Sequence, residues 1–511
     1  MQGDLSKRLY SAEQVRALDS QIINSFSISG ITLMERAARF AFDSLLERWP
    51  SVKKLIVFCG GGNNGGDGYL IAALAAQKQL TVKLIAVSSP STLNADALTA
   101  FTIAGSAGLT AEPFSEDCIN SVRQDDVVDD VVIVDAMLGT GINKPVEGDY
   151  ALAIKLINEH PSPTLAVDIP SGLSSDTGRP LTTAIEADLT CTFIGKKLGQ
   201  MTGLGRSFIG ELKFNTLGAP SEAYETVSSA AYALSMSDLI SEINTRPKHA
   251  HKGFYGHTLL IGGNTGYAGA IALAAQACAR MGAGLTSVAT HPSHANTVLT
   301  HCPEVMTKAV KHGSQLSELL SAASVIVIGP GLGRDAWSEQ MLYHAILADK
   351  PMILDADALN ILSIKSDWLT KRTAPTLMTP HPGEAARLLG SDTALVESDR
   401  LKSVRLLSEK YDASVVLKGS GTLIQKHRRA TALCPYGNPG MASGGMGDVL
   451  SGILGGLWAQ SEWSQSYATD LGVCLHAKAA DIAMQKSGER GMLASDLIPI
   501  ARQLLNRKET N

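Results

Sequence analysis

The residues best suited to chemistry in this 511-residue sequence lie between positions 437 and 452, which read GNPGMASGGMGDVLSG. One carboxylate, Asp448, follows a glycine-rich turn and precedes an apolar helical pattern. The N–H groups of a first helical turn lack partners and bind anions such as phosphate, and glycines let the backbone approach such an anion closely. Asp448 would then accept the proton of a hydroxyl that attacks a phosphoryl group. The alternative is an ordinary turn in which Asp448 caps the helix.

A second glycine-rich turn suits a nucleotide. VVLKGSGTLI, residues 415–424, places this turn directly after a β-branched run, and Lys418 adds a cation for phosphates. A purely structural hairpin would have the same pattern, so the stretch alone does not decide between the two.

Acidic and imidazole groups follow two other apolar runs. TPHPGE, residues 379–384, carries His381 and Glu384 next to prolines that stiffen the backbone. A carboxylate such as Glu384 can hold Mg²⁺ through water near phosphates. DADALN supplies Asp355 and Asp357, although either can simply cap the next helix.

The first half of the chain has a glycine loop of its own. CGGGNNGGDG, residues 59–68, follows a strand pattern and opens an Ala-rich helix, which is the layout of a phosphate site. Its asparagine carbonyls, together with carboxylates, are the oxygen ligands that hard cations prefer. VDAMLGTGINKP contributes Asp135 and Lys144, and VDIPSG contributes Asp168 and Ser171. Asp135 and Asp168 are each equally consistent with a helix or turn cap.

These groups need a scaffold that places strand ends together. β-branched runs alternate with Ala/Leu-rich helical patterns in both halves, which predicts the α/β class, with parallel sheets and helices on both faces. In open α/β sheets ligands bind at the carboxyl ends of the strands, where these glycines and acids cluster. The polar, Ser/Ala-rich stretch between the two series predicts a domain at 1–222, a connector at 223–245 and a second domain at 246–511.

Composition narrows the class of protein. The chain is 45% hydrophobic and 18% charged with a formal net charge of -5, so nucleic acid is not an expected partner. Seven cysteines are scattered without a C-x-x-C pair, which favours a reducing compartment. We find no signal peptide pattern and no apolar run that could span a bilayer, and we therefore expect a cytoplasmic protein without a membrane partner.

The motifs of the second half form an ordered set. HKGFYGHTLLIGG, GPGLG, TPHPGE, LKGSGT and GNPGMASGGMGDVLSG resemble the ribokinase-like superfamily, and more closely its ADP-dependent NAD(P)HX dehydratase branch, over residues 228–505. The resemblance implies that Asp448 is the base and that ADP or AMP is bound by Lys418, Gly419, Ser420, Gly421, Thr422 and Gly447. It also implies that the substrate is bound by Ala270, Gly333, His381 and Asp448. Met446 stands where the family commonly has Thr, and we expect this to alter packing more than chemistry.

The motifs of the first half resemble the NAD(P)HX epimerase domain over residues 10–220. The resemblance implies that the substrate is bound by Asn63, Asn64, Gly65, Gly66, Asp67, Gly139, Thr140, Gly141, Ile142, Asn143, Lys144, Pro145 and Asp168. It implies a potassium ion held by Asn64, Asp135 and Ser171. We nominate Asp168 as the acid–base residue, with Lys197 or Lys144 as alternatives. Leu198 stands where a proline is usual, which weakens the assignment of Lys197.

Together the two resemblances imply a Rossmann-like epimerase domain fused to a ribokinase-like dehydratase domain. NADH or NADPH hydrated at C6 of the nicotinamide ring (NADHX, NADPHX) is the implied substrate, and ADP is the co-substrate that leaves as AMP and phosphate. K⁺ in the first domain, Mg²⁺ in the second and a homo-oligomeric state are further expectations. The alternative is a ribokinase-type small-molecule kinase fused to a non-catalytic nucleotide-binding or interaction module.

Overall fold

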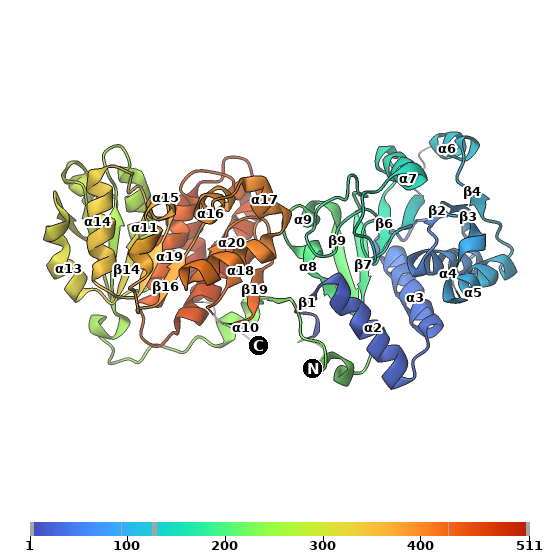
Figure 1. Cartoon of the computed structure of the whole chain (residues 1–511), viewed down its shortest axis with the longest axis horizontal. Helices are drawn as coiled ribbons and strands as arrows, with labels where there is room; N and C mark the ends of the chain where they lie inside the picture. Colours follow the sequence, from blue (N-terminus) through green and yellow to red (C-terminus); the bar gives the residue numbers. More distant parts are fainter. Residues whose placement is uncertain (1–4, 94, 125–129, 428, 507–511) are drawn as a thin grey trace. The chain divides into compact units, whose positions relative to one another are not determined.

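The computed structural model describes residues 5–93, 95–124, 130–427 and 429–506. The chain divides into two compact units, Met1–Tyr232 and Ala233–Asn511 (Figure 1). The division falls inside the stretch for which the sequence predicted a connector, and this stretch contains a short strand, β10 (Ala231–Ala233), and a helix, α10 (Met236–Ser241).

The first unit is built on a parallel sheet of seven strands in the order β4-β3-β2-β5-β6-β7-β9. Four of these strands coincide with the apolar runs of the sequence pattern, because residues buried on both faces must be apolar throughout. The strand bounds are β2 (Lys54–Cys59), β3 (Thr81–Ala86), β4 (Glu112–Pro113), β5 (Val131–Ala136), β6 (Thr164–Val167), β7 (Leu189–Phe193) and β9 (Glu211–Asn215).

Successive residues of the central strands enter different cores. Leu55 and Val57 of β2 pack in one core, and Ile56 and Phe58 pack in another, so both faces of the sheet are covered. The first core is completed by α2 (Ala12–Phe26), α3 (Gly30–Arg48), α4 (Asn63–Gln77) and α5 (Ala95–Ser106), and the second by α6 (Glu116–Arg123) and α7 (Gly148–Glu159). The predicted three-layer αβα architecture is therefore confirmed for this unit.

Three short strands lie apart from that sheet. In the first unit, β1 (Arg8–Tyr10) pairs in parallel with β8 (Lys196–Lys197), and Arg8 and Leu9 lie opposite Tyr232 and Ala231 of β10 in antiparallel register. The helices α8 (Leu198–Met201) and α9 (Gly205–Phe208) follow β8. This pairing holds Lys197 in position opposite Tyr10.

The second unit has a larger mixed sheet. Its strands run in the order β13-β12-β11-β14-β15-β16-β17-β18-β19, parallel as far as β17 and antiparallel for the last two pairings. The strand bounds are β11 (His257–Gly262), β12 (Leu285–Thr290), β13 (Met306–Ala309), β14 (Val325–Ile328), β15 (Met352–Leu354), β16 (Thr376–Met378), β17 (Ser414–Leu417), β18 (Thr422–Gln425) and β19 (Thr431–Cys434).

Helices cover this sheet, and Figure 1 shows α19 next to α11 and α20. Their bounds are α11 (Ala268–Arg280), α12 (Ala295–His301), α13 (Ser317–Ala322), α14 (Ala336–Leu347), α15 (Ala356–Ile364), α16 (Pro382–Leu389), α17 (Thr393–Ser398), α18 (Arg400–Tyr411), α19 (Met446–Trp458), α20 (Gln465–Ser487) and α21 (Ala494–Leu505). Among the described residues, no helix is both long and apolar enough to cross a membrane.

Helix α19 is fixed by close backbone contact. A Cβ atom on Gly452 would lie 2.2 Å from the carbonyl oxygen of Ala274, and one on Gly456 would lie 2.5 Å from that of Cys278, both on α11. A Cβ atom on Gly455 would lie 2.5 Å from Cγ2 of the Val327 side chain in the sheet. Only glycine permits this approach, so these three positions set the depth of α19 and with it the place of its first turn.

Candidate functional site

A buried charged pair lies at the carboxyl edge of the second sheet. The Lys418 Nζ atom, after β17, is 2.8 Å from Oδ1 of Asp355, after β15, and 3.8 Å from Oε2 of Glu384. Thr379 and Ser451 each donate a hydrogen bond of 2.8 Å to the Asp355 carboxylate. Burial would raise the pKa of Asp355, but Lys418 and these donors outweigh it and lower that pKa. Asp355 occupies the N-cap position of α15 without a side-chain capping bond, so capping does not account for it.

Asp448 lies in the first turn of α19, two residues after its start. Gly445 is the N-cap, with φ of +88°, so the cap position does not belong to Asp448. Burial, reinforced by the nearby charges of Asp355 and Asp357 and opposed by Lys418, raises the pKa of Asp448 to about 7. This carboxyl therefore changes charge near neutral pH, which suits a group that accepts a proton.

The backbone before Asp448 is open toward the buried pair. A Cβ atom on Gly447 would lie 3.4 Å from Nζ of Lys418 and 3.7 Å from Oδ2 of Asp355. The start of α19 and the Lys418 ammonium therefore lie close together. This arrangement could accept an anion, and the anion site that the glycine-rich turn predicted stays a prediction.

The turn that was predicted to bind a nucleotide is a hairpin, and nucleotide binding there stays a prediction. Lys418–Gly421 connect the antiparallel strands β17 and β18, and Thr422 begins β18 and donates from its hydroxyl to the Gly419 carbonyl at 3.0 Å. Gly419 has φ of +136°, and a Cβ there would lie 3.0 Å from the guanidinium of the buried Arg400. Ser420 is exposed at the tip of the turn, where a ligand can reach it.

His381 and Glu384 form one end of α16. The Nδ1 atom of His381 accepts from the N–H of Gly383 at 3.0 Å, and Glu384 accepts from the N–H of His381 at 2.8 Å. Burial, together with Lys418, lowers the pKa of His381, and burial raises the pKa of Glu384. His381 is therefore a neutral, half-exposed ring whose position is set by a capping box.

The other predicted substrate residues lie at neighbouring strand ends. The N–H of Gly333, in the turn after β14, donates to Oδ2 of Asp357 at 3.0 Å. Ala270 lies in the first turn of α11 and is close to Gly331, which belongs to the turn after β14. The carboxyl ends of β14, β15, β16 and β17 thus carry Gly333, Asp355, His381 and Lys418, while Ala270 and Asp448 lie in the first turns of α11 and α19.

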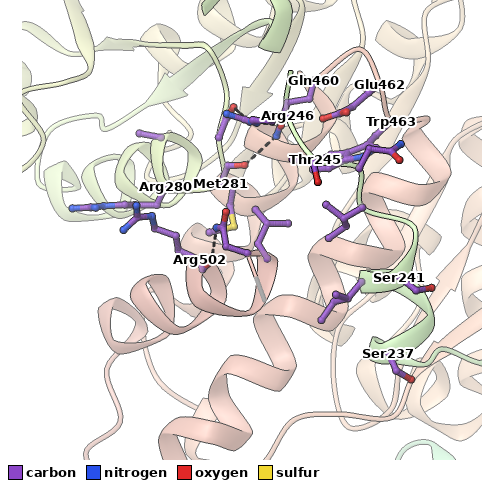
Figure 2. Close-up of a pocket in the computed structure, with 17 residues that line it drawn as sticks. Ser237, Ser241, Thr245, Arg246, Arg280, Met281, Gln460, Glu462, Trp463 and Arg502 are labelled. Atoms are coloured by element: carbon purple, nitrogen blue, oxygen red, sulfur yellow. Dashed lines mark hydrogen bonds between the residues drawn. The ribbon is translucent and has the colours of Figure 1, made fainter. Parts of the chain in front are cut away.

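A cavity of this unit, larger than that of the first unit described below, lies away from these groups. It measures about 810 Å³ and is lined by Arg246, Met281, Gln460 and Trp463 among others (Figure 2). Gln460 follows the C-terminal end of α19, whose 13 residues make it roughly 20 Å long, so the cavity lies at the end opposite Asp448. Arg246 donates a hydrogen bond of 2.6 Å to Oε1 of Gln460. Both residues are labelled in Figure 2, and this bond gives Arg246 a structural role.

The arginines of this larger cavity also have structural explanations. Arg280 and Arg502 belong to the last turns of α11 and α21, where a cation complements the helix dipole. We therefore place the candidate site at Asp448 and not in the larger cavity.

The first unit has a cavity of about 550 Å³ at the carboxyl edge of its sheet. The predicted residues among those that line it are Asn63, Asn64, Asp67, Gly139, Thr140, Gly141, Ile142 and Asp168. Asn143, Lys144 and Pro145 are exposed and outside this lining. Gly65 and Gly66 instead allow close packing, because a Cβ on either would lie within 2.5 Å of Gly60 or Met34.

Asp168 is paired with a buried lysine. Its Oδ1 atom accepts from Nζ of Lys197, which is fully buried and also donates to Thr192 at 2.8 Å. The backbone of Asp168 has φ of +66°, an uncommon conformation for a non-glycine residue. Such strain concentrates at functional sites. Lys197, which the sequence left as an alternative to Asp168, is thus its direct partner.

The three predicted potassium ligands lie around the turn after β5. Asp135 is fully buried and accepts from the N–H of Ser171 at 2.7 Å and from its hydroxyl at 2.5 Å. Burial raises the pKa of Asp135 to about 6, although the Ser171 bonds oppose this. Asn64 lies beside Gly139, and neither atom of its buried amide group has a hydrogen-bond partner. A buried carboxylate and an unsatisfied amide are an oxygen-rich set that a cation would complete.

Comparison with known proteins identifies the family. Residues 258–503 match the family described as NAD(P)H-hydrate dehydratase, and residues 30–199 match the family described as YjeF-related protein N-terminus. The bifunctional NAD(P)H-hydrate repair enzyme of Coxiella burnetii is 42% identical over 98% of this chain and 99% of its own length. That of Escherichia coli is 39% identical over 98% of this chain and 95% of its own.

The chain belongs to the bifunctional NAD(P)H-hydrate repair enzymes. A crystal structure of an ADP/ATP-dependent NAD(P)H-hydrate dehydratase from Bacillus subtilis is 28% identical, with a TM-score of 0.47, and covers 53% of this chain and 96% of its own. The two family matches fall in different units, so a repair enzyme of this kind has one candidate site in each unit.

Sequence reasoning missed one acid of this repair enzyme. Asp19, on α2, lines the cavity of the first unit, and burial, with Asp168 adding and Lys197 opposing, raises its pKa to about 7. The only sequence signal was an acid on an amphipathic helix, which normally indicates a solvated face.

Proposed function

We propose that this chain repairs hydrated nicotinamide nucleotides in both units. The first unit interconverts the R and S epimers of NADHX and NADPHX, and the second dehydrates the S epimer at the expense of ADP. The observation that carries the second activity is Asp448, a carboxyl with a pKa of about 7 at the start of α19, next to the Lys418–Asp355 pair. Family membership supports both activities.

The dehydratase step follows from this geometry. The C6 hydroxyl of the substrate loses its proton to Asp448 as its oxygen attacks the terminal phosphorus of ADP, and the bond from that phosphorus to the leaving AMP breaks. Lys418 and the N–H groups of residues 445–447 stabilise the charge on the phosphoryl oxygens. Phosphate then leaves C6 far more readily than hydroxide would, and loss of the C5 proton restores the dihydropyridine ring.

We propose that the remaining predicted residues position the ligands. Gly419, Ser420, Gly421 and Thr422 would line the nucleotide, and Ala270, Gly333 and His381 would line the hydrated ring. The hairpin tip and the three neighbouring strand ends support this division. In the first unit, Asp168 with Lys197 would move protons at C6, since Asp168 lines the cavity and the buried Lys197 is bonded to it.

Cations would act differently in the two units. The carboxylate of Glu384 is already bonded to the N–H of His381, so nucleotide phosphates and water would hold Mg²⁺. K⁺ would be held by Asn64, Asp135 and Ser171. Its positive charge would balance that of the buried Asp135 carboxylate. We also propose a cytoplasmic location, in keeping with seven free, buried cysteines, and a homo-oligomer, which light scattering would test.

The test uses the two epimers separately. Purified S-NADHX with ADP should regain the absorbance of the dihydronicotinamide ring and release AMP, whereas a ribokinase-type kinase would need a different acceptor. No recovery with ADP or ATP would refute the dehydratase assignment. R-NADHX should be consumed faster than its spontaneous epimerisation in KCl and more slowly in choline chloride, while S consumption stays the same in both salts. An R rate at the spontaneous level in KCl would refute the epimerase assignment.

A further inference from the structure

Of the four carboxyl groups that line the cavity of the first unit, Asp19, Asp67, Asp96 and Asp168, two lie in contrasting environments. Asp168 is bonded to the ammonium of Lys197 and also accepts from the hydroxyl of Thr192 and the N–H of Phe193, each at 3.3 Å. Asp19, from α2 on another wall of the same cavity, forms no hydrogen bond among the described residues. Asp168 is thus held by an ammonium group, whereas burial raises the pKa of Asp19 to about 7.

A second feature shows that the cavity is built for a polar ligand. Asn64 lines it with a side chain that is 8% exposed, and both atoms of its amide group lack partners. An unpartnered buried amide is costly unless a ligand or ion satisfies it. The acids of this cavity therefore lie around a site whose Asn64 amide can still form hydrogen bonds with a ligand.

Epimerisation at C6 needs both an acid and a base. The carbon carries a hydroxyl and the ring nitrogen N1, so the ring opens when the hydroxyl proton leaves, the C–O bond becomes a carbonyl and the C6–N1 electron pair goes to N1. N1 must take a proton in the same step, and rotation about C5–C6 followed by the reverse step closes the ring on the other face. No electrons are gained or lost overall. A buried carboxyl without a hydrogen-bond partner in the described part of the chain and a carboxyl paired with an ammonium group provide the acid and the base that such a step requires.

We propose that Asp19 is the general acid of the epimerase unit, giving its proton to ring nitrogen N1 while Asp168 accepts the proton of the C6 hydroxyl. The inference rests on the epimerase activity proposed above and adds a residue that the motifs do not contain. On re-closure the two residues exchange roles, so each turnover returns both to their starting states.

Several charged or titratable groups face Asp19 and set its working range. These are Asp168, its buried partner Lys197, Asp67 on α4 and Tyr224, while Arg16 on the same helix and Asp96 on α5 line the same cavity. Asp168 and Lys197 act in opposite directions on Asp19, and burial is the larger cause of its protonation. Epimerase activity should therefore fall about tenfold for each pH unit above the pKa of Asp19, because the acid is lost there.

The experiment compares Asp19→Asn, Asp19→Glu and the control Glu13→Gln, an exposed acid on the same helix. Each full-length variant is given R-NADHX with ADP, and separately S-NADHX with ADP. We expect Asp19→Asn to lose at least ~10²-fold of the catalysed epimerisation while S dehydration and the thermal unfolding of the first unit stay as in wild type. Asp19→Glu should recover part of the rate, and the pH above which its activity falls should differ from that of wild type. Glu13→Gln should match wild type.

The outcomes separate the proposals. A wild-type chain that does not epimerise refutes the proposed function, whereas an active wild type together with a fully active Asp19→Asn overturns the role of Asp19. If Asp19→Asn does not fold, Asp19→Glu decides the question. A change in the pH above which epimerase activity falls supports the acid role of Asp19, and an unchanged pH overturns it.

Discussion

Replacing Asp448 by Asn removes the proposed base of the dehydratase unit without changing its size. The amide keeps the first turn of α19 filled but cannot accept the proton of the C6 hydroxyl. Loss of a general base costs typically 10²–10⁴-fold in rate, so we expect kcat for S-NADHX to fall by about 10³-fold. Nucleotide affinity should be kept or increased, because a negative charge beside the phosphates is removed.

The pKa of Asp448 gives the pH dependence of the wild-type enzyme. Only the ionised carboxylate accepts a proton, and its pKa is about 7. About a tenth of the free enzyme is therefore active at one pH unit below that value, and about nine tenths at one unit above it. The rate constant kcat/KM should rise roughly tenfold over this interval and then level off, since kcat/KM reports the free enzyme.

The assay follows absorbance recovery from S-NADHX at saturating ADP, with ADP affinity measured by calorimetry. Asp496→Asn, at the start of α21, is a matched control that should behave as wild type. A wild-type rate for Asp448→Asn would refute the assignment of the base. So would a variant that keeps the same rise of kcat/KM with pH, because the rise would then belong to another group.

Two further substitutions test the turn that precedes Asp448. Gly447→Ala should fold normally, since its Cβ has 3.4 Å to the nearest atom of the neighbours it faces, but its methyl occupies the anion site and should raise the Kd for ADP about tenfold; an unchanged Kd by calorimetry would contradict the anion site. Met446→Thr should keep kcat within about threefold, because the backbone contacts the anion, while loss of this buried side chain lowers the free energy of unfolding by about 1–2 kcal/mol. Urea unfolding measures the second effect, and a tenfold loss of kcat would show that the side chain acts in the chemistry.

Functional motifs at the end of a single strand could be predicted from the sequence, because their chemistry depends only on residues that are neighbours in the chain. A glycine-rich turn at a helix start predicts an anion site wherever it occurs, and Asp448 and Lys418 were found in this way. The resemblance to the epimerase domain, and not this argument, gave Asn64, Asp135 and Ser171 as the potassium ligands. The neighbouring Gly65 and Gly66, which were also predicted to bind substrate, pack α4 closely against Gly60 and Met34, and the sequence does not show which groups lie against a helix.

The sequence by itself determined the α/β class, the alternation of strands and helices and the strand ends at which chemistry occurs, because buried parallel strands require continuous apolar runs. Tertiary structure alone decided which distant groups meet. Asp355 and Lys418 are separated by 63 positions yet form a buried pair, and Asp19 reaches the cavity from a helix outside every motif. The pKa values of Asp19 and Asp448 depend on burial and on charges from other elements. These pKa values can be derived only from the folded structure, because the sequence does not show how far a carboxyl group is removed from water.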